Sequence, residues 1–88
     1  MKIIYSNRAK RDLLVIGDYL RQNDFNLETL AQIRDKIKML KQHPHLGRSY
    51  DQKTRQITVM RRNVVYYEIT SDAIHILHIS AGRQEKKL

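Results

Sequence analysis

The sequence predicts an α+β domain with the element order β-α-α-β-β-β, in which an antiparallel sheet carries a helical hairpin on one face. Three observations predict this class. Apolar residues recur at helical spacing in the first half of the chain, short apolar strands separated by turn residues fill the second half, and one strand precedes the helices. A chain of 88 residues supports one core, so we expect a single domain over residues 1–88.

The chain begins with a short strand, Met1–Tyr5, which leads into a first helix from about Asn7 to Gln22. Ser6 precedes this helix, and its hydroxyl can accept a hydrogen bond from a free N–H of the first turn. One stripe of the helix is apolar and consists of Ala9, Leu13, Ile16 and Leu20. Charged side chains lie largely off this stripe, so the helix has one face to bury.

A second helix is expected after the break "NDFN", where Asn26 can act as its N-cap. Its apolar residues recur every three or four positions and are Leu27, Leu30, Ile33, Ile37 and Leu40. The helix should end near His43, because Pro44 cannot continue the backbone ladder and disfavours helix at the residue before it. Two helices joined by a short loop usually pack as an antiparallel hairpin.

An irregular connector, "HPHLGRSYDQKT", leads from the helices into three strands. These strands are expected at about Arg55–Met60, Val64–Thr70 and Ala73–Ile79. The stretches "RRN" and "SD" lie at the turns between them, and both turns are short enough for β-hairpins.

The last two strands are apolar on both faces, because side chains alternate along a strand. The residues on the two faces are Val65, Tyr67 and Ile69 against Val64 and Tyr66 in the first of them, and Ile74 and Ile76 against Leu77 and Ile79 in the last. Strands of this kind are normally covered on both sides. The two helices can cover only one face of the sheet, so we expect another protein to cover the second.

The charge of the chain points to an acidic partner. Seventeen lysines and arginines against nine acidic residues give a net charge of +8, which favours nucleic acid or an acidic protein segment. The chain has no cysteine, no apolar run of about 20 residues that could span a membrane, and no signal peptide at its N-terminus. We therefore expect a cytoplasmic protein with no membrane partner.

The four histidines do not predict a metal site. His43 and His45 flank Pro44 in the connector, while His75 and His78 lie three apart in a strand and should face opposite ways. Cysteine is absent and no acidic residue falls at a ligand spacing, so we expect neither a metal ion nor another cofactor.

Hydrolytic chemistry has no more support in the sequence. It contains no Gly-x-Ser-x-Gly elbow, phosphate-binding glycine loop or pair of placed carboxylates. Asp12 and Asp18 are interpreted as helix-surface charges that balance neighbouring basic residues.

Basic and aromatic residues gather in the second half of the chain. The basic residues are Arg48, Lys53, Arg55, Arg61, Arg62 and Arg83, and the tyrosines are Tyr50, Tyr66 and Tyr67. Such a set can bind RNA phosphates and stack on bases, or pair with acidic side chains of a protein. It can also be a solvated strand edge, where charge discourages sheet-to-sheet aggregation. The spacing leaves these three interpretations open.

Three segments resemble a known family when read in order: "SNRAKRDLLVIGDYL", "IKMLKQHPHLGR" and "VVYYEITSDAIHILHISAGRQ". They are similar to the first helix, the Pro-x-x-Gly-Arg run and the closing hairpin with its Gly-Arg end in the RelE/ParE superfamily of bacterial toxin–antitoxin toxins. The resemblance covers nearly the whole chain. It implies a β-α-α-β3 fold and an antitoxin that wraps the toxin, which would cover the second face of the sheet.

The superfamily contains two activities. RelE-type members cut messenger RNA on the ribosome with basic residues of the central strands and a C-terminal arginine, and under this alternative Arg55, His78 and Arg83 are the catalytic candidates. The strand interior Val64–Tyr67 has no basic residue and nothing aromatic follows Arg83, so this resemblance lacks a group for proton transfer other than His78.

ParE-type members are more similar to this chain, in the long helical pair and in the pattern Ala9–Leu13, Ile16, Asp18-Tyr19. They inhibit DNA gyrase by binding, so the hypothesis is a ParE-type toxin without catalytic residues. One departure is Ala81, where many relatives have histidine before the closing Gly-Arg. A third alternative is a non-toxic, basic nucleic-acid-binding domain.

The hypothesis assigns residues to two partners. Contact with the target is expected from Arg61, Arg62 and Arg83, with Gly82 turning the backbone so that Arg83 lies beyond the sheet edge. The residues expected to bind the antitoxin are Arg48, Arg55, Arg61, Tyr66, Leu77 and Ile79.

Overall fold

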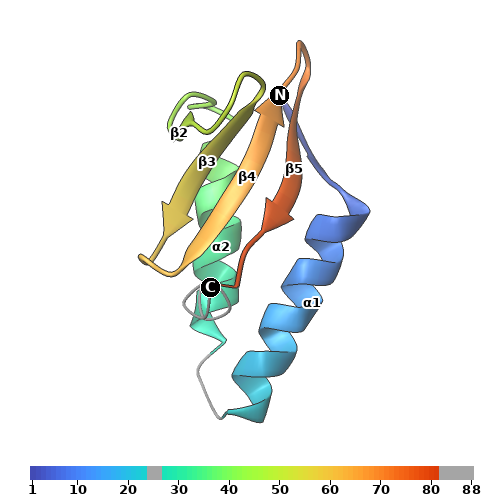
Figure 1. The fold of residues 1–88 in the computed structure, drawn as a ribbon, viewed down its shortest axis with the longest axis vertical. Helices are drawn as coiled ribbons and strands as arrows, with labels where there is room; N and C mark the ends of the chain where they lie inside the picture. Colours follow the sequence, from blue (N-terminus) through green and yellow to red (C-terminus); the bar gives the residue numbers. More distant parts are fainter. Residues whose placement is uncertain (24–26, 82–88) are drawn as a thin grey trace.

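The computed structural model describes residues 1–23 and 27–81, which form two helices and five strands (Figure 1). In chain order these are β1 (Lys2–Tyr5), α1 (Asn7–Gln22), α2 (Glu28–Met39), β2 (Arg48–Ser49), β3 (Thr54–Val59), β4 (Asn63–Ile69) and β5 (Ala73–Ile79). The predicted α+β class and the order of the predicted elements are confirmed. The two-residue strand β2, which lies in the connector, was not predicted.

The strands form one mixed sheet in the order β1-β5-β4-β3-β2. Neighbouring strands from β2 to β5 are antiparallel, as expected, but β1 pairs with β5 in parallel. The antiparallel pairs follow one another through short connections, which force the chain to reverse. The rest of the chain separates β1 from β5, and that length allows a return in the same direction.

The core lies between the sheet and the helices. In Figure 1, α2 passes behind β3 and β4, and α1 lies on the β5 side of the sheet. The largest fully buried side chains are Tyr67, Ile33, Ile37, Leu40, Ile74, Ile76, Ile79, Val59 and Val65. Burial of each such aliphatic side chain contributes about 1.5–3 kcal/mol, so this layer is the main source of stability.

The helix boundaries follow local signals. Ser6 caps α1 as predicted, because its Oγ accepts a hydrogen bond from the N–H of Ala9 at 2.9 Å. The proposed cap of α2, Asn26, lies outside the described residues. The helix ends at Met39 rather than near His43, and the chain continues in turns in which the His43 N–H donates to the Met39 carbonyl at 3.0 Å.

A β-bulge in β5 changes which side chains face the core. Tyr66 pairs with His78 and Tyr67 pairs with Ile76, so Leu77 is one extra residue on β5. The inward alternation therefore passes from Ile76 to Ile79, which is only 1% exposed. The expectation that Ile79 shares the second face with Leu77 is wrong, and Ile79 offers no surface to a partner.

The same bulge changes the face of the sheet on which the histidines of β5 lie. His75 pairs with Glu68 and His78 with Tyr66, and both partners lie on the side of β4 opposite the buried Val65 and Tyr67. The two histidines therefore share one face of the sheet, whereas uninterrupted alternation predicted opposite faces.

Candidate functional site on the outer face of the sheet

The outer face is the side of β3, β4 and β5 that is turned away from α2. Its side chains come from the strand positions that alternate with the buried ones, and they include Gln56, Val64, Tyr66, Glu68, His75 and His78. Figure 1 shows no described helix over this face. Val64, Tyr66 and Leu77 are half-buried. The face is thus uncovered among the described residues, but it is more polar than the sequence suggested.

An aromatic row crosses the outer face. The Tyr50 ring, at the end of β2, meets the Tyr66 ring edge-on with centroids 5.1 Å apart and an interplanar angle of 71°. Tyr66 in turn stacks on the His78 ring at 5.6 Å and 7°. Aromatic pairs of this kind contribute about 0.5–1.5 kcal/mol beyond their buried area. The row therefore joins the connector to β4 and β5 across the middle of the sheet.

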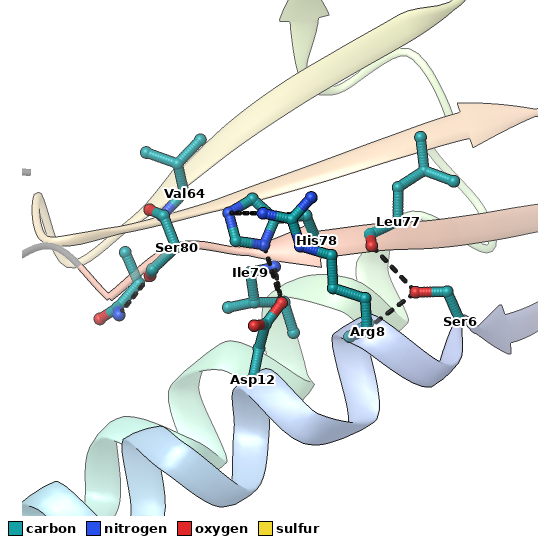
Figure 2. A network of polar contacts seen from close by, with 10 residues as sticks. Ser6, Arg8, Asp12, Val64, Leu77, His78, Ile79 and Ser80 are labelled. Atoms are coloured by element: carbon teal, nitrogen blue, oxygen red, sulfur yellow. Dashed lines mark hydrogen bonds and ion pairs between the residues drawn. The ribbon is translucent and has the colours of Figure 1, made fainter. Parts of the chain in front are cut away.

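The row ends at α1, where His78 meets a carboxylate (Figure 2). The Asp12 Oδ2 lies 2.8 Å from His78 Nδ1 and accepts a second hydrogen bond from the Ile79 N–H at 2.9 Å. Arg8 approaches the other ring nitrogen of His78 at 3.5 Å. The interpretation of Asp12 as a surface charge is wrong, because its side chain is 20% exposed and holds α1 to β5. Asp18, by contrast, pairs with Arg21 at the surface as interpreted.

Asp12 and Ser6 together complete an open strand edge. β1 pairs with β5 only as far as Ile76, which leaves the edge of Leu77–Ile79 without a neighbouring strand. The Ser6 N–H donates to the Ile76 carbonyl at 2.9 Å, and the Ser6 hydroxyl donates to the Leu77 carbonyl at 2.9 Å. Figure 2 shows the contacts of the Ser6 hydroxyl with Leu77 and of Asp12 with Ile79, on the side of β5 that faces α1. The first two turns of α1 thus take the place of a strand and fix His78 on the outer face.

Arg55 and Tyr67 lie on the opposite side of the sheet and hold the connector. They pair across β3 and β4, so both side chains point to the core face. The Tyr67 hydroxyl donates to the Pro44 carbonyl at 2.7 Å and accepts from the Gly47 N–H at 3.0 Å. The Arg55 guanidinium donates to the carbonyls of His45 and Gly47. Arg55 therefore has a structural role that the sequence did not suggest.

The two described catalytic candidates of the RelE-type alternative, Arg55 and His78, are not brought together. Arg55 is held against the connector on the core face, whereas His78 lies on the outer face beside Asp12. Arg83, the third candidate, and Gly82 lie outside the described residues. A substrate on the outer face would meet His78 without Arg55.

The remaining predicted site residues fall into two places. Arg48 pairs in register with Gln56, which pairs with Tyr66, so Arg48 and Tyr66 share the outer face. Arg61 and Arg62 are exposed at the turn between β3 and β4, at the other end of β3. Their assignments to the target and the antitoxin stay predictions.

One carboxylate near the outer face orders a turn. The Asp51 Oδ1 accepts hydrogen bonds from the N–H groups of Thr54 and Lys53 at 2.8 and 3.0 Å, and these two bonds lower the pKa of Asp51. Asp51 thereby closes the bend that leads from β2 to β3.

Two kinds of site are missing from the described part of the chain. No three of its histidine and acidic side chains come together in a group that could hold a metal ion. Within residues 1–23 and 27–81, neither helix is long and apolar enough to cross a membrane.

The comparisons with known proteins give one family. A family model described as the ParE toxin of the type II toxin–antitoxin system parDE matches residues 3–86. The chain belongs to this ParE toxin family. The resemblance to the RelE/ParE superfamily is confirmed, and ParE rather than RelE is the member that matches. Comparison with curated protein sequences gave no significant match.

Solved structures support the fold of this ParE-family chain. A chain of the chromosomal ParDE toxin–antitoxin system from P. aeruginosa is 23% identical, with a TM-score of 0.77 over 92% of this chain and 95% of that one. A YafQ mutant from E. coli is 11% identical, with a TM-score of 0.62 over 96% of both chains. In the E. coli DinJ–YafQ toxin–antitoxin complex the matching chain is 12% identical, with a TM-score of 0.58 over 94% and 93%. At these identities the likeness concerns the fold.

Proposed function

We propose that this protein is the toxin of a type II toxin–antitoxin pair and that it stops growth by binding DNA gyrase without catalysis. The observation that carries the proposal is the match of the ParE toxin family over residues 3–86. The separation of Arg55 from His78 adds support, since mRNA cleavage by general acid–base catalysis needs its groups within hydrogen-bond reach of the same reacting atoms. The target and the toxin then meet in the cytoplasm.

A cognate antitoxin neutralises the toxin by covering the outer face. Support comes from Val64, Tyr66 and Leu77, which are only half-buried in a sheet whose outer face no described helix covers, and from exposed Arg48, which the register places near Tyr66. An antitoxin segment with apolar and acidic side chains complements this surface. Interfaces of the usual size bury about 1,200–2,000 Å², so such a segment would cover much of the sheet.

Induced expression tests the proposal. Expression of the chain alone should stop bacterial growth, and co-expression of the neighbouring small gene should restore it. The purified protein should inhibit supercoiling by gyrase and should leave translated mRNA uncut in a toeprint assay.

Each opposing result has a distinct meaning. Harmless expression of folded protein contradicts the toxin assignment and favours a basic nucleic-acid-binding domain. Cleavage of mRNA within the ribosome, with supercoiling unaffected, contradicts gyrase as target and favours the endoribonuclease alternative.

A further inference from the structure

The turn between β3 and β4 has an unusual backbone for its sequence. Met60 and Arg61 have φ angles of 55° and 61°, and they are the only non-glycine residues of the described chain with positive φ. The Arg62 N–H donates to the Val59 carbonyl at 3.1 Å and closes the turn around these two residues. Two successive left-handed residues are the signature of a type I′ turn.

Neither side chain suits this conformation. Left-handed backbone brings the Cβ of an L-residue too close to its own carbonyl oxygen, and type I′ turns therefore favour Asn-Gly or Gly-Gly. Methionine and arginine both carry the Cβ that glycine lacks, and neither has the short polar side chain of asparagine. The turn is therefore strained, although Asn-Gly or Gly-Gly would adopt the same backbone without strain. Backbone strain of this kind is found most often at functional sites.

The base of the turn is firmly held, so the strain is not relieved by movement there. Asn63 is 5% exposed, and its Nδ2 donates to the Ser80 carbonyl at 2.8 Å. The Val64 N–H donates to the Ser80 Oγ at 3.1 Å, and the Ser80 N–H donates to the Val64 carbonyl at 2.9 Å. These bonds tie the first residues of β4 to the end of β5 and fix the direction in which the turn projects.

The residues at the end of the turn, Met60, Arg61 and Arg62, are here called the tip. All three are exposed, and Met60 is 52% exposed although it is apolar. Neither of the two ion pairs found in the described part of the chain involves a tip residue. The tip thus presents two cationic groups beside one adaptable apolar side chain, and methionine and arginine are both enriched at protein interfaces.

We propose that the tip is a preformed contact element for the toxin's protein target, with Arg61 and Arg62 pairing with carboxylates and Met60 filling an apolar pocket between them. This inference rests on the proposed function and adds Met60 and the backbone strain to it. The tip lies beyond Val59 at the end of β3, whereas Arg48 pairs with Gln56 within that strand and the aromatic row crosses the sheet at Tyr66, the partner of Gln56. The antitoxin and the target therefore use different surfaces, and Arg61 belongs to the target surface.

A double substitution separates the effect of the two side chains from the effect of the backbone conformation of the turn. Met60→Asn/Arg61→Gly installs the preferred residues of the turn, so the melting temperature should rise by a few degrees. Antitoxin affinity should stay within twofold, while inhibition of gyrase and of growth should fall at least tenfold. Arg62→Gln should weaken inhibition several-fold without a change in melting temperature. Arg11→Gln, which removes an exposed arginine of α1, is the matched control and should change none of these values.

The outcomes distinguish the two proposals. A double variant that is more stable and still fully inhibits gyrase overturns the proposed role of the tip and leaves the proposed function intact. A wild-type protein that stops growth without inhibiting gyrase overturns the gyrase assignment, and the tip is then supported by a double variant that no longer stops growth. Equal losses of growth inhibition and antitoxin affinity overturn the separation of the two surfaces. A double variant that loses binding to RNA or DNA but keeps its inhibition of gyrase shows that the tip binds nucleic acid, and this result overturns the proposed protein target.

Discussion

Arginines lie at both ends of β3, and the two ends use them in opposite ways. At the connector end, one guanidinium nitrogen of Arg55 and the hydroxyl of Tyr67 hydrogen-bond to backbone groups of Pro44–Gly47, which holds the loop against the sheet. At the tip end, Arg61 and Arg62 are exposed and the backbone beneath them is strained. An arginine within the strand is structural here because its register turns it toward the core, whereas the arginines of the turn beyond the strand stay available for a partner.

The largest effect that tests this comparison is expected from Gly47→Ala. A Cβ at this position would lie 2.5 Å from the Gln56 carbonyl oxygen and 2.7 Å from the Tyr67 hydroxyl oxygen. The connector must then move away from β3, and we expect the free energy of unfolding to fall by about 3 kcal/mol in chemical denaturation. Gly17→Ala in α1 is the control, because its Cβ would meet only the ends of flexible side chains, Leu30 at 3.3 Å and Arg21 at 3.8 Å. Equal stability of the two variants would mean that the connector is not closely bonded.

Tyr67→Phe should have the next largest effect. It removes one hydroxyl that serves both Pro44 and Gly47, and leaves a carbonyl and an N–H in the protein without that partner. We expect a loss of about 2 kcal/mol by thermal denaturation, since an unmade buried hydrogen bond costs about 1–3 kcal/mol. Tyr50→Phe, at an exposed ring, should cost less than about 0.5 kcal/mol. A loss as small for Tyr67→Phe would contradict the role given to its hydroxyl.

At the tip a substitution should raise the free energy of unfolding, whereas the substitutions at the connector end lower it. Arg61→Gly places glycine at a φ of 61° and should raise the free energy of unfolding by about 1 kcal/mol. Arg62→Gly is the control, because Arg62 has no positive φ and glycine there only increases the freedom of the unfolded chain. The comparison between the two ends of β3 fails if both substitutions destabilise the protein alike.

The smallest effect concerns pH at the connector end. The N–H groups of Thr54 and Lys53 hold the pKa of Asp51 below its ordinary value of about 4. A carboxyl with a lowered pKa stabilises the folded state above the unfolded pKa, and this contribution is lost as the pH falls through the folded pKa. The stability difference between wild type and Asp51→Asn should therefore be constant near neutral pH and shrink below about pH 4. Melting curves that stay equally far apart down to pH 2 would show that the carboxylate charge contributes nothing.

The sequence predicted the features that depend on neighbouring residues. Helical spacing, the Ser6 cap and the turn signals are local, and α1 was placed at the bounds that the structure has. In α2 the spacing correctly predicted the buried Ile33 and Ile37, but Leu27 of the predicted stripe is 42% exposed and the buried Thr29 was not predicted. The order of the elements and the α+β class follow from such signals together.

The features that failed depend on residues far apart in the chain. The bulge at Leu77 accompanies a hydrogen bond from Ser6, 71 residues earlier, and no signal within β5 marks it. Asp12 lies off the apolar stripe like any surface charge, yet its partner His78 is 66 residues away. Arg55 lies in β3 and pairs with Tyr67, and the face of the sheet to which its side chain points is set by pairing across strands rather than by local spacing. Much of the candidate site therefore needed the structure.

The pairing of β1 with β5 has a consequence for how the protein is made. The first strand finds its neighbour in the last one, so during translation β1 and the start of α1 must wait for nearly the whole chain before the sheet can close. At about 5–20 residues per second this wait lasts several seconds, and contacts so distant in sequence also slow folding itself. The edge that Ser6 and Asp12 complete does not exist in a truncated chain. A prematurely terminated product would thus lack a finished sheet, and a cell that stops synthesis early would release no folded toxin.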